Sequence, residues 1–493
     1  MSLKNNYLLD SLKYLALIFV MALCCRVTQG AFVYALGLMA AIFIIQKKIG
    51  SAMVFYMLIS FLSVTNRVFM GLSPMFLLGA KVANMMVLMA AFFMVGQVRT
   101  NRKLPVASLW IYLLFAVISS FDGWFPIISF LKIINFGIML SVMMMLSKIM
   151  QNTDKDLYQI RCVMMAFAMF LIWGSMFARL VPSIGYSMEV QKAANWGIET
   201  TGAEVASREG RRMFNGMTYH SQAFGPLIAI IGSWLLCDML FIERRLVKLH
   251  LSLLAIVPVF LYMSRSRTAF VTIAATVMVL LFYALPKANI SRQIKGKVMN
   301  MFVLLLLLLL AVMAISQIRN QAISKWLRKT DEVKTDQRSL IDAVASSRMG
   351  LIEQSLRDFK LNPVFGKGFQ VHDWHKIAYQ CGAITLFSAP LEKGNLFVMI
   401  LGEGGLCGAM AFLVFLLAFY STCMKKRYSC LMTLFTCFLA SNLAESMFFA
   451  PSGTGGTEWA ICSIGAFAVD IIVIRQQEKE KAFASGRMPV AII

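Results

Sequence analysis

The sequence contains little charge: Asp, Glu, Lys and Arg make up 14% of its 493 residues, whereas 59% are hydrophobic. A soluble domain usually carries about a quarter charged residues. Apolar runs such as residues 301–315 (MFVLLLLLLLAVMAI) cannot follow one another inside a water-soluble core of this size, so they require lipid. The scarcity of charge therefore excludes a soluble protein and predicts an all-α polytopic membrane protein.

Several patterns that mark common catalytic and metal sites are also missing. The ten cysteines are scattered, nearly all in apolar runs, and form no CxxC pair, which excludes a disulfide framework and a cysteine-rich metal site. The glycine-rich segment 363–369 (PVFGKGF) lacks the spacing and the Ser or Thr of a P-loop, so no ATP site follows from it. His372 and His375 have a spacing that suits a metal ion, but no third ligand is evident.

Apolar runs long enough to cross a bilayer, at roughly 20 residues each, dominate what is present. We predict about fourteen transmembrane helices, with twelve as the lower bound, because the second and third runs are short and could be merged or re-entrant. The first run has no A-x-A cleavage site, so we expect a retained span rather than a signal peptide. The runs lie near residues 8–25, 31–46, 50–66, 74–97, 104–120, 124–147, 158–181, 222–242, 248–263, 268–285, 298–316, 394–420, 428–447 and 458–474.

Basic residues predict the orientation of these helices. If the N-terminus is cytoplasmic, every cytoplasmic loop is basic, as the positive-inside rule requires, and the short outer loops hold only Arg26, Arg67, Arg265 and Arg267. Both termini are then inside, and both long polar stretches are outside. The expected organisation is N-terminal helices (1–181), an outer loop (182–221), helices with the short outer loop SRSRT (222–316), a large outer loop carrying short helices (317–393), C-terminal helices (394–475) and a cytoplasmic tail (476–493).

Charged side chains near the outer face are the candidates for chemistry. Lys81 and Lys132 lie inside predicted spans, where they either snorkel to the interface or line a cavity that attracts an anion. Arg265 and Arg267 in SRSRT have the planar fork that suits phosphate oxygens. Glu403 lies within a span, where a carboxylate is either functional or part of a structural ion pair.

The large outer loop contains one clear helix signal, SSRMGLIEQSLRDFKLNP, at residues 346–363. Apolar residues recur at helical spacing from Met349 to Phe359, Ser346 or Ser347 can cap the start, and Asn362-Pro363 ends it. On composition alone, it is an amphipathic helix on the membrane surface whose arginines are solvated.

Four segments, in order, resemble signatures of the O-antigen ligase and polysaccharide polymerase superfamily. SRSRTAF (264–270) resembles its short-loop S-R-x-A motif, and residues 348–369 resemble its R-x-x-x-W…P-x-x-G-x-G segment. EKGNLFVMILGEGGLCG (392–408) resembles its H-N…E-x-G-x-x-G segment, and RRMFNGMTYHSQAF (211–224) resembles its upstream arginine segment. The four segments cover roughly residues 211–410, all on the predicted outer face.

The resemblance implies a GT-C-like bundle that transfers glycans without a metal ion or other cofactor. The donor would be a glycan on undecaprenyl diphosphate, used at the periplasmic face of a bacterial inner membrane. The acceptor would be the lipid A core in a ligase or another carrier-linked repeat in a polymerase, and a chain-length regulator is a further conceivable partner.

The resemblance also implies roles for individual residues. Where the family most often has His before Asn, this chain has Gly394, so the base for the acceptor hydroxyl is missing from its usual place. Glu392 is the nearest substitute, and His220 and Glu403 are further candidates. The residues expected to contact the diphosphate are Arg267, Arg348, Arg212 (or its neighbour Arg211), Arg265, Lys393 and Asn395.

Two other classes of protein remain as alternatives. A flippase or polysaccharide exporter would place its charges near the midplane and show two similar halves, whereas here the charges cluster at the outer face and no internal repeat is evident. A structural scaffold would not need the arginines of SRSRT. We therefore expect a polymerase or ligase, and the missing His and the high span count favour a polymerase or exopolysaccharide enzyme.

Overall fold

The computed structural model describes most of the chain as helices. The described residues are 6–28, 30–65, 81, 83–90, 102–151, 153–180, 214–218, 221–264, 266–287, 291, 293, 295–297, 299–300, 340–371, 395–443, 447–451 and 453–485. Within them, all regular elements are helical, and strand geometry is limited to one isolated bridge between Thr65 and Thr218. The all-α prediction is therefore confirmed for this part of the chain.

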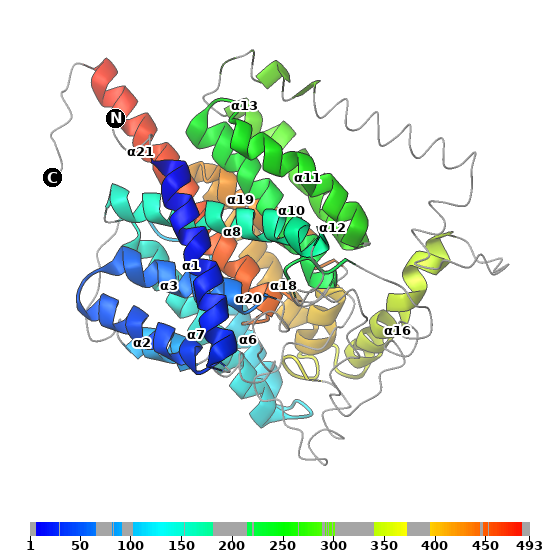
Figure 1. Cartoon of the computed structure of the whole chain (residues 1–493). Helices are drawn as coiled ribbons and strands as arrows, with labels where there is room; N and C mark the ends of the chain where they lie inside the picture. Colours follow the sequence, from blue (N-terminus) through cyan, green and yellow to red (C-terminus); the bar gives the residue numbers. More distant parts are fainter. Residues whose placement is uncertain are drawn as a thin grey trace.

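The helices follow one another with short connections (Figure 1). The first group is α1 (Tyr7–Val27), α2 (Ala31–Ile45), α3 (Ile49–Leu62), α6 (Leu109–Phe121), α7 (Pro126–Ile149) and α8 (Asp154–Leu180). The second group is α10 (Ser221–Cys237), α11 (Lys248–Ser264), α12 (Arg267–Val279), α13 (Leu285–Lys287), α16 (Leu340–Leu361), α18 (Leu396–Lys426), α19 (Ser429–Ser441), α20 (Gly453–Ala460) and α21 (Phe467–Ala484). The π-helical turns η3 (Asp238–Glu243), η4 (Leu280–Ala284) and η5 (Ile461–Ala466) directly follow α10, α12 and α20.

The predicted spans correspond closely to these helices. Six described helices are long and apolar enough to cross a membrane, and six further apolar helices have 10–17 residues. Each of them coincides with one of the predicted runs. The other two runs, 74–97 and 298–316, lie largely outside the described residues, so the number of crossings stays a prediction.

Burial separates the helices into a centre and a periphery. In the centre, α10 packs against α11, α12 and α19, and α8 packs against α1, α3 and α21 (Figure 1). Outer helices expose large apolar side chains, such as Leu23 of α1, Leu114 of α6 and Leu417 of α18, which are 60%, 60% and 63% exposed. Such a surface suits contact with lipid tails, because water would have to hydrate it at a large free-energy cost.

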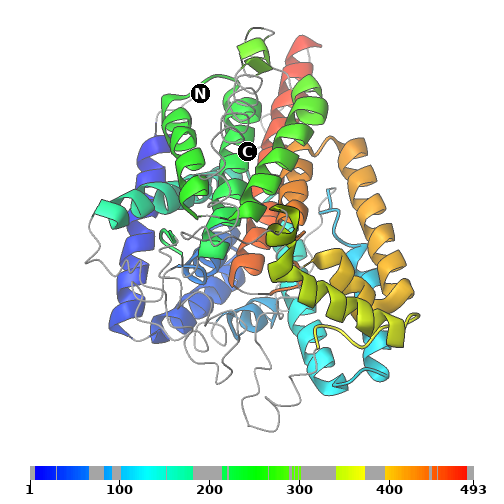
Figure 2. The ribbon, with the colours of Figure 1, turned by 90° about the vertical axis from the view of Figure 1, so that its right-hand side faces the viewer.

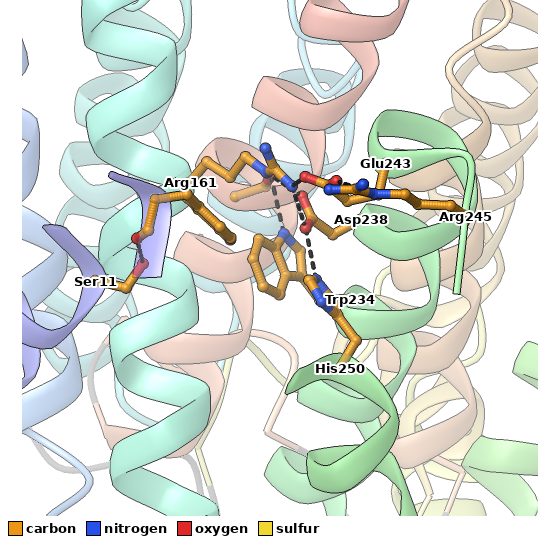
Figure 3. Close-up of polar contacts among 9 residues, drawn as sticks. Ser11, Arg161, Trp234, Asp238, Glu243, Arg245 and His250 are labelled. Carbon is orange, nitrogen blue, oxygen red and sulfur yellow. Dashed lines mark hydrogen bonds and ion pairs between the residues drawn. The ribbon is translucent and has the colours of Figure 1, made fainter. Parts of the chain in front are cut away.

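A buried network of charges joins the central helices (Figure 3). Arg161 of α8 donates to both carboxylate oxygens of Asp238 at 2.6 and 2.8 Å and to Glu243 at 2.6 Å. His250 of α11 lies 2.8 Å from Asp238, and the Arg161 guanidinium lies 4.2 Å from the centre of the Tyr7 ring. Because the charges are paired, this network is tolerated in the interior and ties α1, α8, η3 and α11 together.

Charged residues from separate loops gather beside this network at one end of the bundle, which we call the basic end. Arg475 and Lys479 of α21 pair with Asp154 of α8, Arg102 pairs with Glu478, and Arg244 pairs with Glu480. These segments are the ones predicted to face the cytoplasm. The opposite end, which we call the loop end, carries residues 214–218, 264–267, 361–371 and the start of α18; the basic end points up in Figures 1 and 2.

Candidate functional site

Helix α18 is interrupted at Gly405, near the loop end. The φ of 59° and ψ of −158° at this residue lie in a region that essentially only glycine adopts. A break of this kind leaves backbone amides and carbonyls on both sides without helical partners. In a membrane, every such group has to be satisfied by the protein itself.

The loop that follows α16 supplies the missing partners. The amides of residues 406–407 donate to the carbonyls of residues 363–364 at 2.8 and 3.1 Å, and the amides of residues 367–368 donate to the carbonyls of residues 402–403 at 3.1 Å each. The hydroxyl of Ser119 on α6 adds a 2.6 Å hydrogen bond to the carbonyl of residue 403. We call this contact between residues 363–368 and 402–407 the α18 junction.

Glycines allow the backbones of the α18 junction to approach so closely. A Cβ atom on Gly366 would lie 2.3 Å from the carbonyl oxygen of Glu403, and one on Gly405 would lie 2.4 Å from that of Val364. A Cβ atom on Gly402 would lie 2.8 Å from the carbonyl oxygen of Ser355 on α16. The two glycine-containing segments singled out in the sequence are therefore the two halves of one backbone contact.

A buried ion pair fixes the same loop to two further elements. Lys367 Nζ lies 2.8 Å from Asp358 Oδ1 of α16 and 3.3 Å from the centre of the Trp124 ring, which precedes α7. The amide of Trp124 donates to the carbonyl of Lys367 at 3.1 Å. An ammonium group held between a carboxylate and an aromatic face is stable when buried. Sequence reasoning missed this group, and its only signal was a charged pair flanking the Asn362-Pro363 helix stop.

Lys132 of α7 holds the end of the loop. Its side chain is 3% exposed, and its Nζ donates to the carbonyl of Gln370 at 2.8 Å. The Gln370 side chain in turn donates to the carbonyl of Phe449 at 3.0 Å. Of the two alternatives considered for Lys132, snorkelling to the interface is thus not what the structure shows.

Helix α16 carries Arg348 and lies beside α18 (Figure 2). It ends at Leu361, as predicted, but begins already at Leu340. Its buried residues are Ser355 and Asp358, whereas Leu356 is 39% exposed, so the apolar face predicted from spacing is not the face that packs on α18. The reason is that α16 meets α18 through backbone at Gly402, where only a small side chain fits.

The upstream segment and the short loop also lie side by side. The amide of Phe214 donates to the carbonyl of Met263 at 3.4 Å, and the Phe214 ring stacks on Phe260 of α11 with centres 5.2 Å apart. A Cβ atom on Gly225 of α10 would lie 2.5 Å from the Cβ of Ser266, which directly precedes Arg267 and α12. The structure thus brings two predicted site segments together, in addition to the pair that forms the α18 junction.

The other predicted site residues fall into three groups. Asn395 caps α18, since its side chain accepts from the amides of residues 397–398 at 2.9 and 3.3 Å and donates to the carbonyl of Leu443 at 2.9 Å. This structural role accounts for Asn395 without a ligand. Glu403 is buried, with 2% of its surface exposed. The remaining residues, Arg212, His220, Arg265, Glu392 and Lys393, lie outside the described residues.

Comparison with known proteins adds a family to this geometry. Residues 252–413 match a protein-family model described as O-antigen ligase. The matched stretch includes α11, α12, α16 and the α18 junction. No curated protein and no solved structure matches the chain.

We expect Gly405→Ala to unfold the α18 junction. Alanine there adopts a backbone conformation that costs about 1–3 kcal/mol, and its Cβ would meet the carbonyl of Val364 at 2.4 Å. The matched control is Gly404→Ala, because a Cβ on Gly404 would meet nothing within 4 Å. Thermal unfolding of the purified protein should show a lower Tm for Gly405→Ala only. Equal Tm values for the two variants would refute the junction.

We also expect strong coupling between Asp358 and Lys367. Removing one partner leaves a buried, uncompensated charge and should destabilise by about 3–5 kcal/mol. The double variant Asp358→Asn/Lys367→Met should therefore lose less stability than the sum of the two single variants, as measured by a double-mutant cycle in denaturant. Additive losses would mean that the two side chains do not form a pair in solution.

Proposed function

Because this chain belongs to the O-antigen ligase superfamily through residues 252–413, we propose that it transfers or polymerises glycan repeats from an undecaprenyl-diphosphate donor at the periplasmic face of the inner membrane. The family makes it a membrane enzyme of glycan ligation or polymerisation. The donor, the face and the absence of a metal ion are our proposal. The acceptor is the lipid A core or another carrier-linked repeat.

The observation that supports this proposal best is the attachment of α16 to α18. The predicted diphosphate ligand Arg348 lies on α16, and the α18 junction fixes this helix to the bundle at the loop end. The second predicted ligand, Arg267, is the first residue of α12, so its charge coincides with the positive end of a helix dipole. Both features favour an anion at the loop end.

In the proposed reaction, the acceptor hydroxyl attacks the anomeric carbon of the donor sugar while the bond from that carbon to the diphosphate oxygen breaks. Negative charge then builds on the leaving diphosphate, and guanidinium groups already in place stabilise it. A carboxylate or imidazole takes the hydroxyl proton. Glu403 is 2% exposed, so Glu392 and His220 are the candidates to test first for this role.

A lipid-linked oligosaccharide flippase or exporter is the second candidate, because transporters often use broken helices. In α18, the backbone groups next to the break bond to the loop at residues 363–368. Transporters instead direct such groups at substrates or ions. This difference favours the enzyme.

The direct test uses purified protein in nanodiscs with an undecaprenyl-diphosphate oligosaccharide and no nucleotide. A ladder that grows by whole repeats indicates a polymerase, and one discrete shift that needs lipid A core indicates a ligase. If neither product forms and proteoliposomes instead move the lipid across the bilayer, the enzyme is wrong and the transporter takes its place.

We predict that Arg267→Ala and Arg348→Ala each lower turnover about 100-fold or more, because each removes a donor that stabilises the leaving diphosphate. Arg→Lys should fail as well if the contact is bidentate. Arg26→Ala, at an exposed arginine near the end of α1, is the matched control and should retain turnover. Wild-type product from both arginine variants would remove the diphosphate-binding role.

For the general base, we predict that Glu392→Gln lowers turnover roughly 100-fold, within the range typical of a lost proton acceptor. The rate should be measured at saturating donor, so that a binding defect is not mistaken for a slower reaction step. Unchanged turnover would exclude Glu392, and His220→Gln would then be expected to show the loss.

A further inference from the structure

Lys81 is a lysine buried within the bundle. Its side chain is 1% exposed, and its Nζ has no hydrogen-bond partner or ion pair in the part of the chain that the structure describes. Lys132 and Lys367, in contrast, are both bonded to acceptors. A charged ammonium group in a membrane interior is costly unless it is paired, so Lys81 lacks something that the other two lysines have.

The group that faces Lys81 is the first turn of α20. A Cβ atom on Gly456 would lie only 2.8 Å from Lys81 Nζ, so the ammonium occupies the space that this glycine leaves open. The first turn of a helix presents amides that are not bonded within the helix, together with the positive end of the helix dipole. Two positive groups therefore face each other in a buried place, which is unfavourable without an anion between or beside them.

The surrounding described residues do not supply this anion. Glu458 on the same helix is buried, with 1% of its surface exposed, but it forms no ion pair with Lys81. Thr457 donates to the carbonyl of Ser60 on α3 at 2.8 Å, which anchors the turn beside α3 (Figure 1). The turn is thus held in place by α3, and its open side belongs to Gly456 and Lys81.

We propose that Lys81 and the first turn of α20 form a binding site for a phosphate-type oxyanion. A helix N-terminus beside a lysine is a common arrangement for phosphate, because backbone amides contact its oxygens and the ammonium balances its charge. Helix α20 begins on the same side as the start of α18, so the site opens toward the loop end. Only the natural source of the anion, the diphosphate of a carrier lipid, rests on the proposed function.

The test measures thermal unfolding of the full chain in detergent as inorganic pyrophosphate is added. A ligand that binds only the folded state raises Tm with concentration. Wild type should show this rise, and Lys81→Met should need at least roughly tenfold more pyrophosphate for the same shift, since a charged hydrogen bond is lost. Lys13→Met, at a lysine that is 67% exposed, is the charge-matched control and should respond like wild type.

A second measurement separates a binding site from a structural lysine. Without any anion, Lys81→Met should be at least as stable as wild type, because it replaces a buried unpaired charge by an apolar side chain of similar length. A clear loss of stability or of folding in Lys81→Met would show that Lys81 has a structural partner, and would overturn the proposal. So would an unchanged pyrophosphate response in that variant, or no response of the wild type.

The source of the anion follows from a comparison of probes. A larger shift with farnesyl diphosphate than with pyrophosphate supports a lipid headgroup, and equal shifts support a free phosphate-type anion. Because these measurements contain no glycan and no acceptor, they remain informative if the transfer assay fails. A failure of both pyrophosphate and farnesyl diphosphate would remove the site while leaving the transfer activity open.

Discussion

The break in α18 at Gly405 is the constraint on which the loop end of the structure depends. A helix in lipid can be interrupted only where another segment bonds to the freed amides and carbonyls. Residues 363–368 do so, and in the same step they bring α16 and its Arg348 against the bundle. Lys367 extends the attachment to Trp124, between α6 and α7. The position of the proposed catalytic loop is thus set by backbone contacts that require glycine, and to a lesser extent by apolar packing.

The two ends of the bundle use charge differently. At the basic end, Arg161 is paired with Asp238 and Glu243, so its charge serves to hold helices together. At the loop end, Lys367 and Lys132 hold the loop, whereas Lys81 faces the first turn of α20 without a partner in the described part of the chain. An enzyme that handles a lipid diphosphate needs positive charge that is not yet neutralised at the end where this lipid binds. The proposed function and the proposed anion site share this requirement.

The sequence predicted the helices and the family, because both depend on local patterns: apolar runs of sufficient length, and motifs in a fixed order. It also predicted the end of α16, since Asn362-Pro363 is a local stop signal. The α18 junction was not predictable, because the conformation of Gly405 depends on a loop far away in the sequence. Lys81 and Lys132 look alike in the sequence, and only the fold shows which has an acceptor. Asn395 is different: an Asn before an apolar run is a recognised cap signal, which was available but was interpreted as a ligand contact.

Hydrogen–deuterium exchange of the full chain in nanodiscs tests the α18 junction most directly. The amides of residues 367–368 and 406–407 bond across the junction and not within a helix. They should therefore exchange as slowly as the amides in the middle of α10, which is almost entirely buried. If these four amides instead exchange as fast as those of an exposed loop, the break in α18 is not filled by residues 363–368. The account of how α16 is held at the loop end would then be wrong.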